Sequence, residues 1–149
     1  MILRSTAPQA GSSLSLLRQV IGGVSLPSIL IVDDHSAIRR ALRAAFEHQA
    51  DFTVCGEAEN GLDAIAKAKM LAPDLIVLDL RMPEMDGLQT ARALKALMPN
   101  VPLMMLTCYN STAAEREALA SGVTAVFSKP DGMQNLIWQA RAVLNSKHN

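Results

Sequence analysis

The chain has 149 residues, long enough for a single domain with one sizeable hydrophobic core. Half of the residues are hydrophobic but only 3% are aromatic, so aliphatic side chains and Met must fill that core, as in parallel sheets covered by helices. Lys plus Arg and Asp plus Glu both number 14, and this balance argues against a nucleic-acid-binding surface or attraction to an anionic membrane.

The N-terminal residues differ in composition from the rest of the chain. They are rich in Ser, Gly and Ala and contain no acidic residue before Asp33. Their mildly apolar stretch, residues 14–26, contains Arg18 and is too short to span a bilayer. We therefore expect a flexible tail without membrane contact over residues 1–27, a folded domain over 28–146 and a short tail over 147–149.

The two cysteines, Cys55 and Cys108, lie far apart and form neither a C-x-x-C pair nor a metal-ligand pattern. This usage fits a reducing compartment better than a disulfide scaffold. A cytoplasmic location is therefore expected.

From residue 28 onward, short apolar runs alternate with stretches of helical periodicity. This alternation is typical of βαβ units and of a parallel sheet. The five expected strands are residues 28–33, 52–56, 74–79, 101–107 and 123–128. Four of the helices between and after them carry an apolar stripe: Ile38, Ala41, Leu42, Ala45 and Phe46; Leu62, Ile65 and Ala66; Leu88, Ala91, Leu94 and Leu97; Leu136, Ile137, Ala140, Val143 and Leu144.

The fourth helix, expected at about 112–121, differs from the others. Its only large apolar residue is Leu119, and the rest are mostly Ala, Glu, Arg and Ser. We expect it to be weakly anchored, and a weakly anchored element can shift between arrangements at low cost in free energy.

Polar residues that suit phosphoryl chemistry stand at the ends of four expected strands. Asp33 and Asp34 follow the first apolar run, Asp79 closes the third, and Thr107 and Lys129 end the last two. In an open doubly wound sheet, ligands bind beyond the carboxyl ends of the strands, so these side chains are expected to lie together. Each alone is ordinary, because Asp favours turns and caps and a lone Thr or Lys is usually solvated.

Carboxylates on one sheet edge repel one another and repel any phosphate, and a divalent cation resolves this conflict. Three carboxylates, one Lys and one Mg²⁺ sum to zero charge, and Mg²⁺ prefers hard oxygen ligands. Asp79 can then act as a nucleophile that forms an aspartyl phosphate.

Two other classes of protein compete for this pattern. A Mg²⁺-dependent aspartyl phosphohydrolase often carries a second Asp two residues after the nucleophile as its acid–base group, but here that position is Arg81. A flavin carrier on the same topology needs a hydroxyl- and Gly-rich phosphate loop after the first strand, where Asp33 and Asp34 would repel a phosphate. Both readings are therefore disfavoured.

Four motifs stand in a fixed order, namely Val32-Asp33-Asp34, Asp79 with Met82-Pro83-Glu84-Met85-Asp86-Gly87, Leu106-Thr107 and Ser128-Lys129-Pro130. With these motifs the chain, over about residues 28–145, resembles the receiver domain of bacterial two-component response regulators. It is most like receivers that are usually fused to a LuxR-type helix-turn-helix output. The resemblance implies a flavodoxin-like, doubly wound five-stranded parallel sheet with strand order 2-1-3-4-5 and five helices.

The resemblance also implies roles for the acidic residues. Asp79 would accept a phosphoryl group from a phosphohistidine on a sensor kinase or phosphotransfer protein. Asp34 and Asp79 would bind Mg²⁺ directly, together with the backbone carbonyl of Arg81, while Asp33 would act mainly through bound water.

The remaining motif residues would contact the phosphoryl group or shape the loops. Thr107 and Lys129 would each contact a phosphoryl oxygen, and the bond between Lys129 and Pro130 would be cis. Asp86 is expected to be the N-cap of the third helix. The family's usual aromatic residue three positions before the Lys is Val126 here, and Phe127 should point to the opposite face of the strand by simple alternation.

No output module follows the expected domain, so the resemblance implies a stand-alone receiver that docks a downstream protein or self-associates. The alternative is the receiver half of a DNA-binding regulator without its output domain. Catalysis would be limited to its own phosphorylation and dephosphorylation, without direct binding of nucleic acid by this chain.

Two further expectations concern Trp138 and the histidines. The apolar stripe of the fifth helix turns Trp138 outward, and we expect it beside the fourth helix, on a docking or self-association surface that responds to Asp79; a ring without a partner is the alternative. His35, His48 and His148 show no ligand spacing, and solvated or helix-edge roles are expected for them.

Overall fold

The computed structural model describes residues 20–21, 24–108 and 111–146. Residues 1–19 of the expected N-terminal tail, and the C-terminal tail 147–149 with His148, lie outside the described residues. The strands are β1 (Val20–Ile21), β2 (Val24–Ser25), β3 (Ser28–Val32), β4 (Thr53–Ala58), β5 (Leu75–Asp79), β6 (Leu103–Thr107) and β7 (Ala125–Ser128). The helices are α2 (Ser36–Glu47), α3 (Gly61–Leu71), α4 (Gly87–Leu97), α5 (Thr112–Ala120), the 3₁₀ turn η1 (Lys129–Asp131) and α6 (Met133–Ser146).

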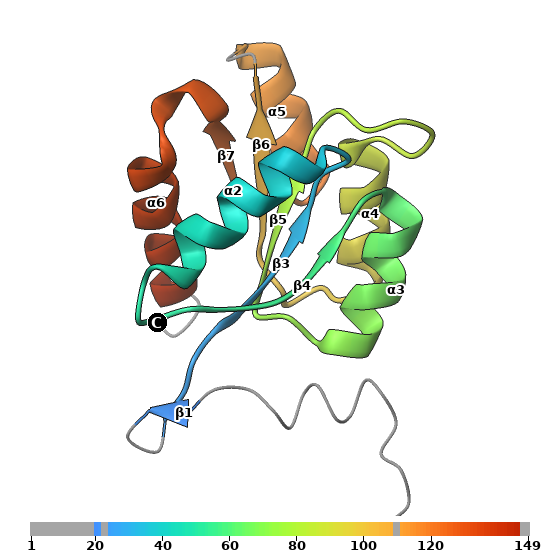
Figure 1. The fold of residues 1–149 in the computed structure, drawn as a ribbon. Helices are drawn as coiled ribbons and strands as arrows, with labels where there is room; N and C mark the ends of the chain where they lie inside the picture. Colours follow the sequence, from blue (N-terminus) through green and yellow to red (C-terminus); the bar gives the residue numbers. More distant parts are fainter. Residues whose placement is uncertain (1–19, 22–23, 109–110, 147–149) are drawn as a thin grey trace, which may run out of the picture.

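Five of the strands form one parallel sheet in the order β4-β3-β5-β6-β7 (Figure 1). Numbered along the sheet-forming strands this is 2-1-3-4-5, so the predicted doubly wound fold is confirmed. The expected strand ranges agree with the structure to within about two residues. Ahead of this sheet, β1 and β2 pair antiparallel as a separate two-stranded sheet.

The sheet carries one hydrophobic layer on each face. On one face, alternate strand residues such as Ile29, Ile31 and Val77 pack against α2 and α6. On the other face, residues such as Leu30 and Leu78 pack against α3, α4 and α5. Because successive residues of a strand point to opposite faces, a strand that is buried on both sides must be apolar throughout, as β3 and β6 nearly are.

The orientation of α3 corrects one predicted stripe. Its buried residues are Gly61, Ala64, Ala68 and Leu71, whereas Leu62 is 68% exposed. The buried face is therefore rotated by about one residue from the expected one. Small side chains on this face let the helix lie close to its neighbours, and a Cβ at Gly61 would collide with Thr90 and Met85.

Helix α5 makes little contact with the core, as its sequence indicated. Ala118 is its only buried residue, and Leu119, its only large apolar residue, is 47% exposed. A single buried methyl group stabilises a helix far less than a buried Leu, because hydrophobic stabilisation scales with the apolar area removed from water.

Two predicted side-chain orientations are confirmed and one predicted location is wrong. Phe127 is buried in the α2 and α6 layer, whereas Val126 packs against the opposite layer. Trp138 is 71% exposed. It does not lie beside α5, however: it lines a groove with Ala45, in the C-terminal half of α2, and with His48, the residue that follows this helix. The buried stripe of α6 faces the sheet, so the position after Ile137 turns toward α2.

Among the described helices, none combines the length and the hydropathy that crossing a membrane requires.

Candidate functional site

The sheet brings the strand-end residues to one edge. Asp79 is the last residue of β5 and Thr107 the last of β6, and Lys129 directly follows β7. The register pairs Asp79 with Leu106 and Thr107 with Ser128, so the three strand ends lie side by side. All the strands are parallel, which is why residues far apart in the chain converge here.

An ion-pair triad forms the centre of the site. The Lys129 Nζ lies 3.0 Å from the Asp79 Oδ1 and 3.3 Å from the Asp33 Oδ2. Asp33 is fully buried and Asp79 is 4% exposed, so both carboxylates are largely removed from water. A single Lys faces two carboxylates here, and the triad alone carries a net negative charge when all three groups are ionised.

The pKa of Asp79 is raised above its ordinary value. Burial is the largest cause, and repulsion from Asp33 and Asp34 adds to it, while the hydrogen bond with Lys129 opposes the rise. For Lys129, burial lowers the pKa, but the hydrogen bond and charge of Asp79, together with Asp33, outweigh this and raise it. Lys129 is therefore a cation at neutral pH, and the ionised form of Asp79 gains from additional positive charge nearby.

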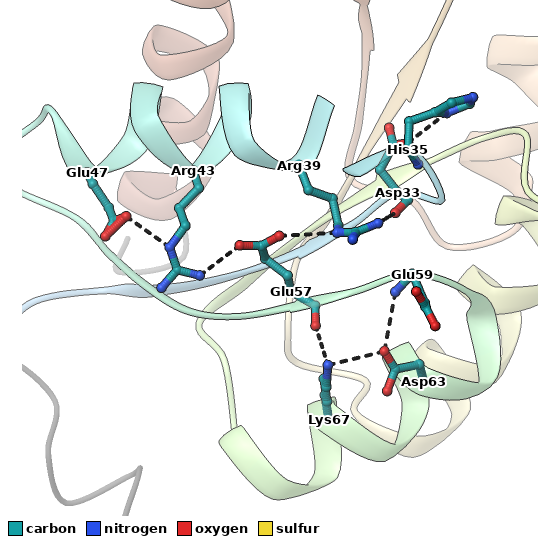
Figure 2. Close-up of polar contacts among 9 residues, drawn as sticks. All are labelled: Asp33, His35, Arg39, Arg43, Glu47, Glu57, Glu59, Asp63 and Lys67. Atoms are coloured by element: carbon teal, nitrogen blue, oxygen red, sulfur yellow. Dashed lines mark hydrogen bonds and ion pairs between the residues drawn. The ribbon is translucent and has the colours of Figure 1, made fainter. Parts of the chain in front are cut away.

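His35 stands at the N-cap of α2, as the expected helix-edge role requires, and it also contacts the acidic residues of the site. Its backbone N–H donates to the Asp33 Oδ1 at 2.9 Å, and its Nδ1 lies 3.2 Å from that oxygen (Figure 2). The same Nδ1 lies 3.1 Å from the Asp34 Oδ1. The imidazole remains 63% exposed. The sequence signal for this contact is the position of His35 directly after two carboxylates. A search for regular metal-ligand spacing does not find it.

The acidic cluster suits a hard cation. Asp33, Asp34, His35 and Asp79 each offer a ligand atom, and these atoms lie within 4.8 Å of one another. The Asp34 Oδ1 is buried and accepts no hydrogen bond from the described part of the chain, although the His35 Nδ1 lies 3.1 Å away. An orphaned carboxylate oxygen costs free energy unless a cation or another partner satisfies it. The residues present therefore fit Mg²⁺, whose preferred ligands are oxygens.

The loop after β5 is held close to Asp79. The Gly87 N–H donates to the Leu80 carbonyl at 2.9 Å, and a Cβ on Gly87 would collide with the Asp79 carbonyl oxygen. Asp86 is the N-cap of α4, as predicted, and forms a capping box with Gln89. Gly87 thus allows the start of α4 to pack against the end of β5.

Arg81 and Thr107 lie at the same edge of the sheet as the acidic cluster. Arg81 is exposed and lines a groove of about 690 Å³ together with Asp34, His35 and Pro83. Thr107 is 5% exposed. The structure thus brings Asp33, Asp34, Asp79 and Lys129 together in one cluster and places the other two predicted residues around them.

The expected cis bond between Lys129 and Pro130 stays a prediction, because the side chain of Pro130 lies outside the described part of the structure. At the end of the η1 turn, the Gly132 N–H donates to the Lys129 carbonyl at 3.3 Å.

Comparison with known proteins identifies the family. The family model of the response regulator receiver domain matches residues 29–141. The chain belongs to this family. The match covers every sheet-forming strand from Ile29 onward and most of α6.

Relatives of this receiver domain are response regulators. VraR of Staphylococcus saprophyticus is 36% identical over 119 residues, which cover 80% of this chain and 57% of VraR. The transcriptional regulatory protein YdfI of Bacillus subtilis is 37% identical over 108 residues, which cover 72% of this chain and 50% of YdfI. The receiver domain thus spans about half the length of the curated relatives that it matches.

Solved receiver structures share the fold. The response regulator domain of Thermotoga maritima CheB superposes with a TM-score of 0.75 at 28% identity, covering 80% of this chain and 97% of that chain. A CheY-like receiver domain protein of Methanospirillum hungatei gives a TM-score of 0.77 at 27% identity, covering 83% and 98%. The family is a signalling receiver rather than an enzyme of the ordinary kind.

Proposed function

We propose that this receiver domain accepts a phosphoryl group on Asp79 from the phosphohistidine of a sensor kinase or phosphotransfer protein, and that phosphorylation switches a protein-binding surface. The observation that carries the proposal is the ion-pair triad: a buried carboxylate at a strand end, 3.0 Å from Lys129 and beside two further carboxylates. Such an arrangement raises the pKa of Asp79 and leaves a demand for positive charge, which a purely structural pair would not.

Mg²⁺ would be held by Asp33, Asp34 and Asp79, together with the backbone carbonyl of Arg81. When bound, it supplies positive charge that neutralises the carboxylates and the incoming phosphoryl oxygens. The orphaned Asp34 Oδ1 supports this assignment, since a cation would satisfy it.

The transfer step itself would use the chain's own side chains. Lys129 holds the Oδ1 of Asp79, so the Oδ2 is the oxygen that forms the new bond to phosphorus, while the phosphorus–nitrogen bond of the donor breaks and the imidazole keeps the electron pair. Lys129 then pairs with a phosphoryl oxygen, and the hydroxyl of Thr107 donates to another. The reaction needs the ionised form of Asp79, and Lys129 favours that form.

The output of the switch would be a downstream protein or a second copy of the chain, in the cytoplasm where phosphodonor kinases act. The coverage of relatives favours one further possibility, in which the domain is the receiver part of a longer, DNA-binding regulator, because it spans only 50% of YdfI. A phosphohydrolase is less favoured, since Arg81 stands where the acid–base carboxylate would be required.

Incubation with acetyl phosphate and Mg²⁺, followed by intact-mass measurement, tests the proposal. We expect one phosphoryl group on the wild type and none on Asp79→Asn. Peptide mapping that places the group on Ser, His or another Asp would contradict the assignment.

The metal assignment has its own test in Asp34→Ala, which should lose both Mg²⁺ binding and phosphoryl uptake. Glu59→Ala is the matched control, because Glu59 is an exposed carboxylate outside the acidic cluster. Undiminished uptake by Asp34→Ala in the presence of a chelator would rule out the proposed role of Mg²⁺.

A further inference from the structure

The guanidinium of Arg39 grips the backbone that carries the acidic pair. Its Nη1 donates to the carbonyl oxygen of Asp33 at 2.7 Å, and its Nε donates to the Glu57 Oε1 at 3.1 Å (Figure 2). The Arg39 side chain is only 15% exposed. We infer that Arg39, braced by Glu57, is a positioning residue that orients the Asp33 and Asp34 carboxylates and thereby sets the cation affinity of the site; this inference rests on the proposed function.

The hydrogen bond from Arg39 to the Asp33 carbonyl also constrains the orientation of the Asp34 side chain. The Asp33 carbonyl and the Asp34 N–H belong to one planar peptide unit, so a hydrogen bond that fixes the oxygen also fixes the plane from which the Asp34 side chain leaves the backbone. The ladder of β3 ends at Val32, and the Asp33 N–H still donates to the Ala58 carbonyl of β4 at 3.1 Å. Arg39 therefore holds the Asp33–Asp34 peptide, just beyond the end of the strand.

Glu57 fixes the position of the Arg39 guanidinium, because Glu57 itself contacts three elements. It lies on β4, its Oε2 accepts a hydrogen bond from Arg43 of α2 at 3.0 Å, and its backbone carbonyl accepts one from Lys67 of α3 at 2.6 Å (Figure 2). Its charge also compensates Arg39, a cation placed in the first turn of α2, where the helix dipole disfavours positive charge. The contacts of Arg39 with Asp33 and Glu57 thus connect the loop after β3 to the neighbouring strand β4.

Arginine suits this role through its shape. The planar guanidinium presents donors on separate edges, so one side chain can hold a carbonyl and a carboxylate at fixed relative positions. A Lys at this position could keep one of the two contacts but not the rigid geometry of both. The conservative exchange therefore separates the effect of charge from the effect of positioning.

Arg43 provides a matched control. It lies one turn later on the same helix and pairs with the other oxygen of Glu57 and with Glu47, and its hydrogen bonds do not reach Asp33. Arg43→Gln removes the same kind of side chain from the same network, but it leaves both hydrogen bonds of Arg39 and the Lys67 contact of Glu57 in place, so only a small effect is expected. If Arg39 merely stabilised the fold, both substitutions would act alike.

The first measurement uses the metal-free protein and follows the exchange of the His35 amide, which donates to the Asp33 Oδ1, by NMR. We expect exchange about tenfold faster in Arg39→Gln, the effect of losing about one net hydrogen bond, and within a factor of about two of the wild type in Arg43→Gln. Glu57→Gln, which keeps Arg39 but weakens its brace, should fall between them. Equal exchange rates in Arg39→Gln and Arg43→Gln would overturn the inference.

The second measurement is calorimetric titration with Mg²⁺ alone. We expect Arg39→Gln to bind Mg²⁺ about tenfold more weakly and Arg39→Lys to be intermediate, while Arg43→Gln stays within a factor of about two. With saturating Mg²⁺, the rate of phosphorylation of Arg39→Gln by acetyl phosphate should return to near that of the wild type. An unchanged Mg²⁺ affinity, or a loss of rate that saturating Mg²⁺ does not restore, would overturn the inference.

The two proposals fail in different ways. If the wild type takes up no phosphoryl group, the proposed function is wrong, and the exchange data still decide whether Arg39 orders the loop. If the wild type is phosphorylated and Arg39→Gln matches it in every measurement, the positioning role alone is wrong.

Discussion

At the scale of single residues, Lys129 controls the charge of the site. It is the cation that contacts both Asp33 and Asp79 within the described part of the chain, and both carboxylates are buried. Its contact opposes, without cancelling, the rise in the pKa of Asp79 that burial causes. The ionised form of Asp79 is therefore less stable in the folded chain than in the unfolded chain. A bound cation would stabilise this ionised form, which is the form that accepts a phosphoryl group.

This balance predicts that Asp79→Asn stabilises the metal-free protein. A carboxyl group whose pKa is higher in the folded than in the unfolded chain binds more protons when folded, so the free energy of unfolding falls as the pH rises through that range. At neutral pH in a chelator, we expect Asp79→Asn to gain on the order of 1 kcal/mol in urea unfolding.

The control for this prediction is Glu59→Gln, an exposed carboxylate whose removal should change the free energy of unfolding by less than about 0.5 kcal/mol. Added Mg²⁺ should then stabilise the wild type more than Asp79→Asn, because it binds only the intact cluster. A lower stability of Asp79→Asn in the chelator would show that the ion pair with Lys129 outweighs the burial of charge.

At the scale of helices and strands, α3 ends in a strained conformation. Its C-cap is Ala72, in the left-handed region with φ 48°, where the Ala72 N–H still donates to the Ala68 carbonyl. Gly is the usual residue at such a cap, because it has no Cβ to clash with the backbone.

Ala72→Gly should therefore stabilise the protein by about 0.5–1 kcal/mol in chemical unfolding. The same exchange at Ala66, which is exposed in the middle of α3, should destabilise it by about 1 kcal/mol, since Gly is a poor helix former. Opposite signs for one chemical change identify the backbone conformation as the cause. Destabilisation at both positions would contradict the left-handed cap.

Helix α5 is the element with the smallest share in the core. With Ala118 as its only buried residue, it should open locally without unfolding the sheet. We expect its amides to exchange with deuterium faster than those of α4 and α6 by a factor of about 5–30, equivalent to a local stability lower by 1–2 kcal/mol. Exchange of α5 only together with the core strands would show that it is held as firmly as the other helices.

At the scale of the whole molecule, Arg141 ties α6 to the segment between α2 and β4. Its Nε donates to the Asp51 Oδ2 at 2.7 Å, its Nη2 reaches Gln49, and its guanidinium lies 5.4 Å from the centroid of the Phe52 ring. This contact joins positions about 90 residues apart in the chain. Both charged groups are partly exposed, so solvent weakens their attraction.

The ion pair between Arg141 and Asp51 predicts that Asp51→Asn has a small, pH-dependent effect on the free energy of unfolding. Hydrogen bonds from Arg141 hold the pKa of Asp51 below its ordinary value of 3.8, so the pair contributes stability above that pH and loses it as the pH falls through the lowered pKa. Thermal unfolding at neutral pH should show a loss of about 0.5 kcal/mol in Asp51→Asn, which disappears at a pH well below 3.8. A difference that persists in acid would assign the effect to packing rather than to charge.

Much of this architecture follows from the sequence because it depends on local patterns. Apolar runs that alternate with helical stripes predicted five parallel strands, and polar residues at the ends of those runs predicted the gathering of Asp33, Asp34, Asp79 and Lys129. Parallel strands bring their carboxyl ends to one edge, so the order of residues along the chain was enough to place them together.

Other features required the tertiary structure, because they depend on how each helix is rotated and which loops meet. A shift of one residue in the buried face of α3 exposes Leu62, and the rotation of α6 places Trp138 beside α2 instead of α5. The pairing of Arg39 with Glu57 likewise joins two elements whose sequences contain no signal of each other. Periodicity defines which residues are apolar, but only the packing of one element against another decides the partner that each side chain contacts.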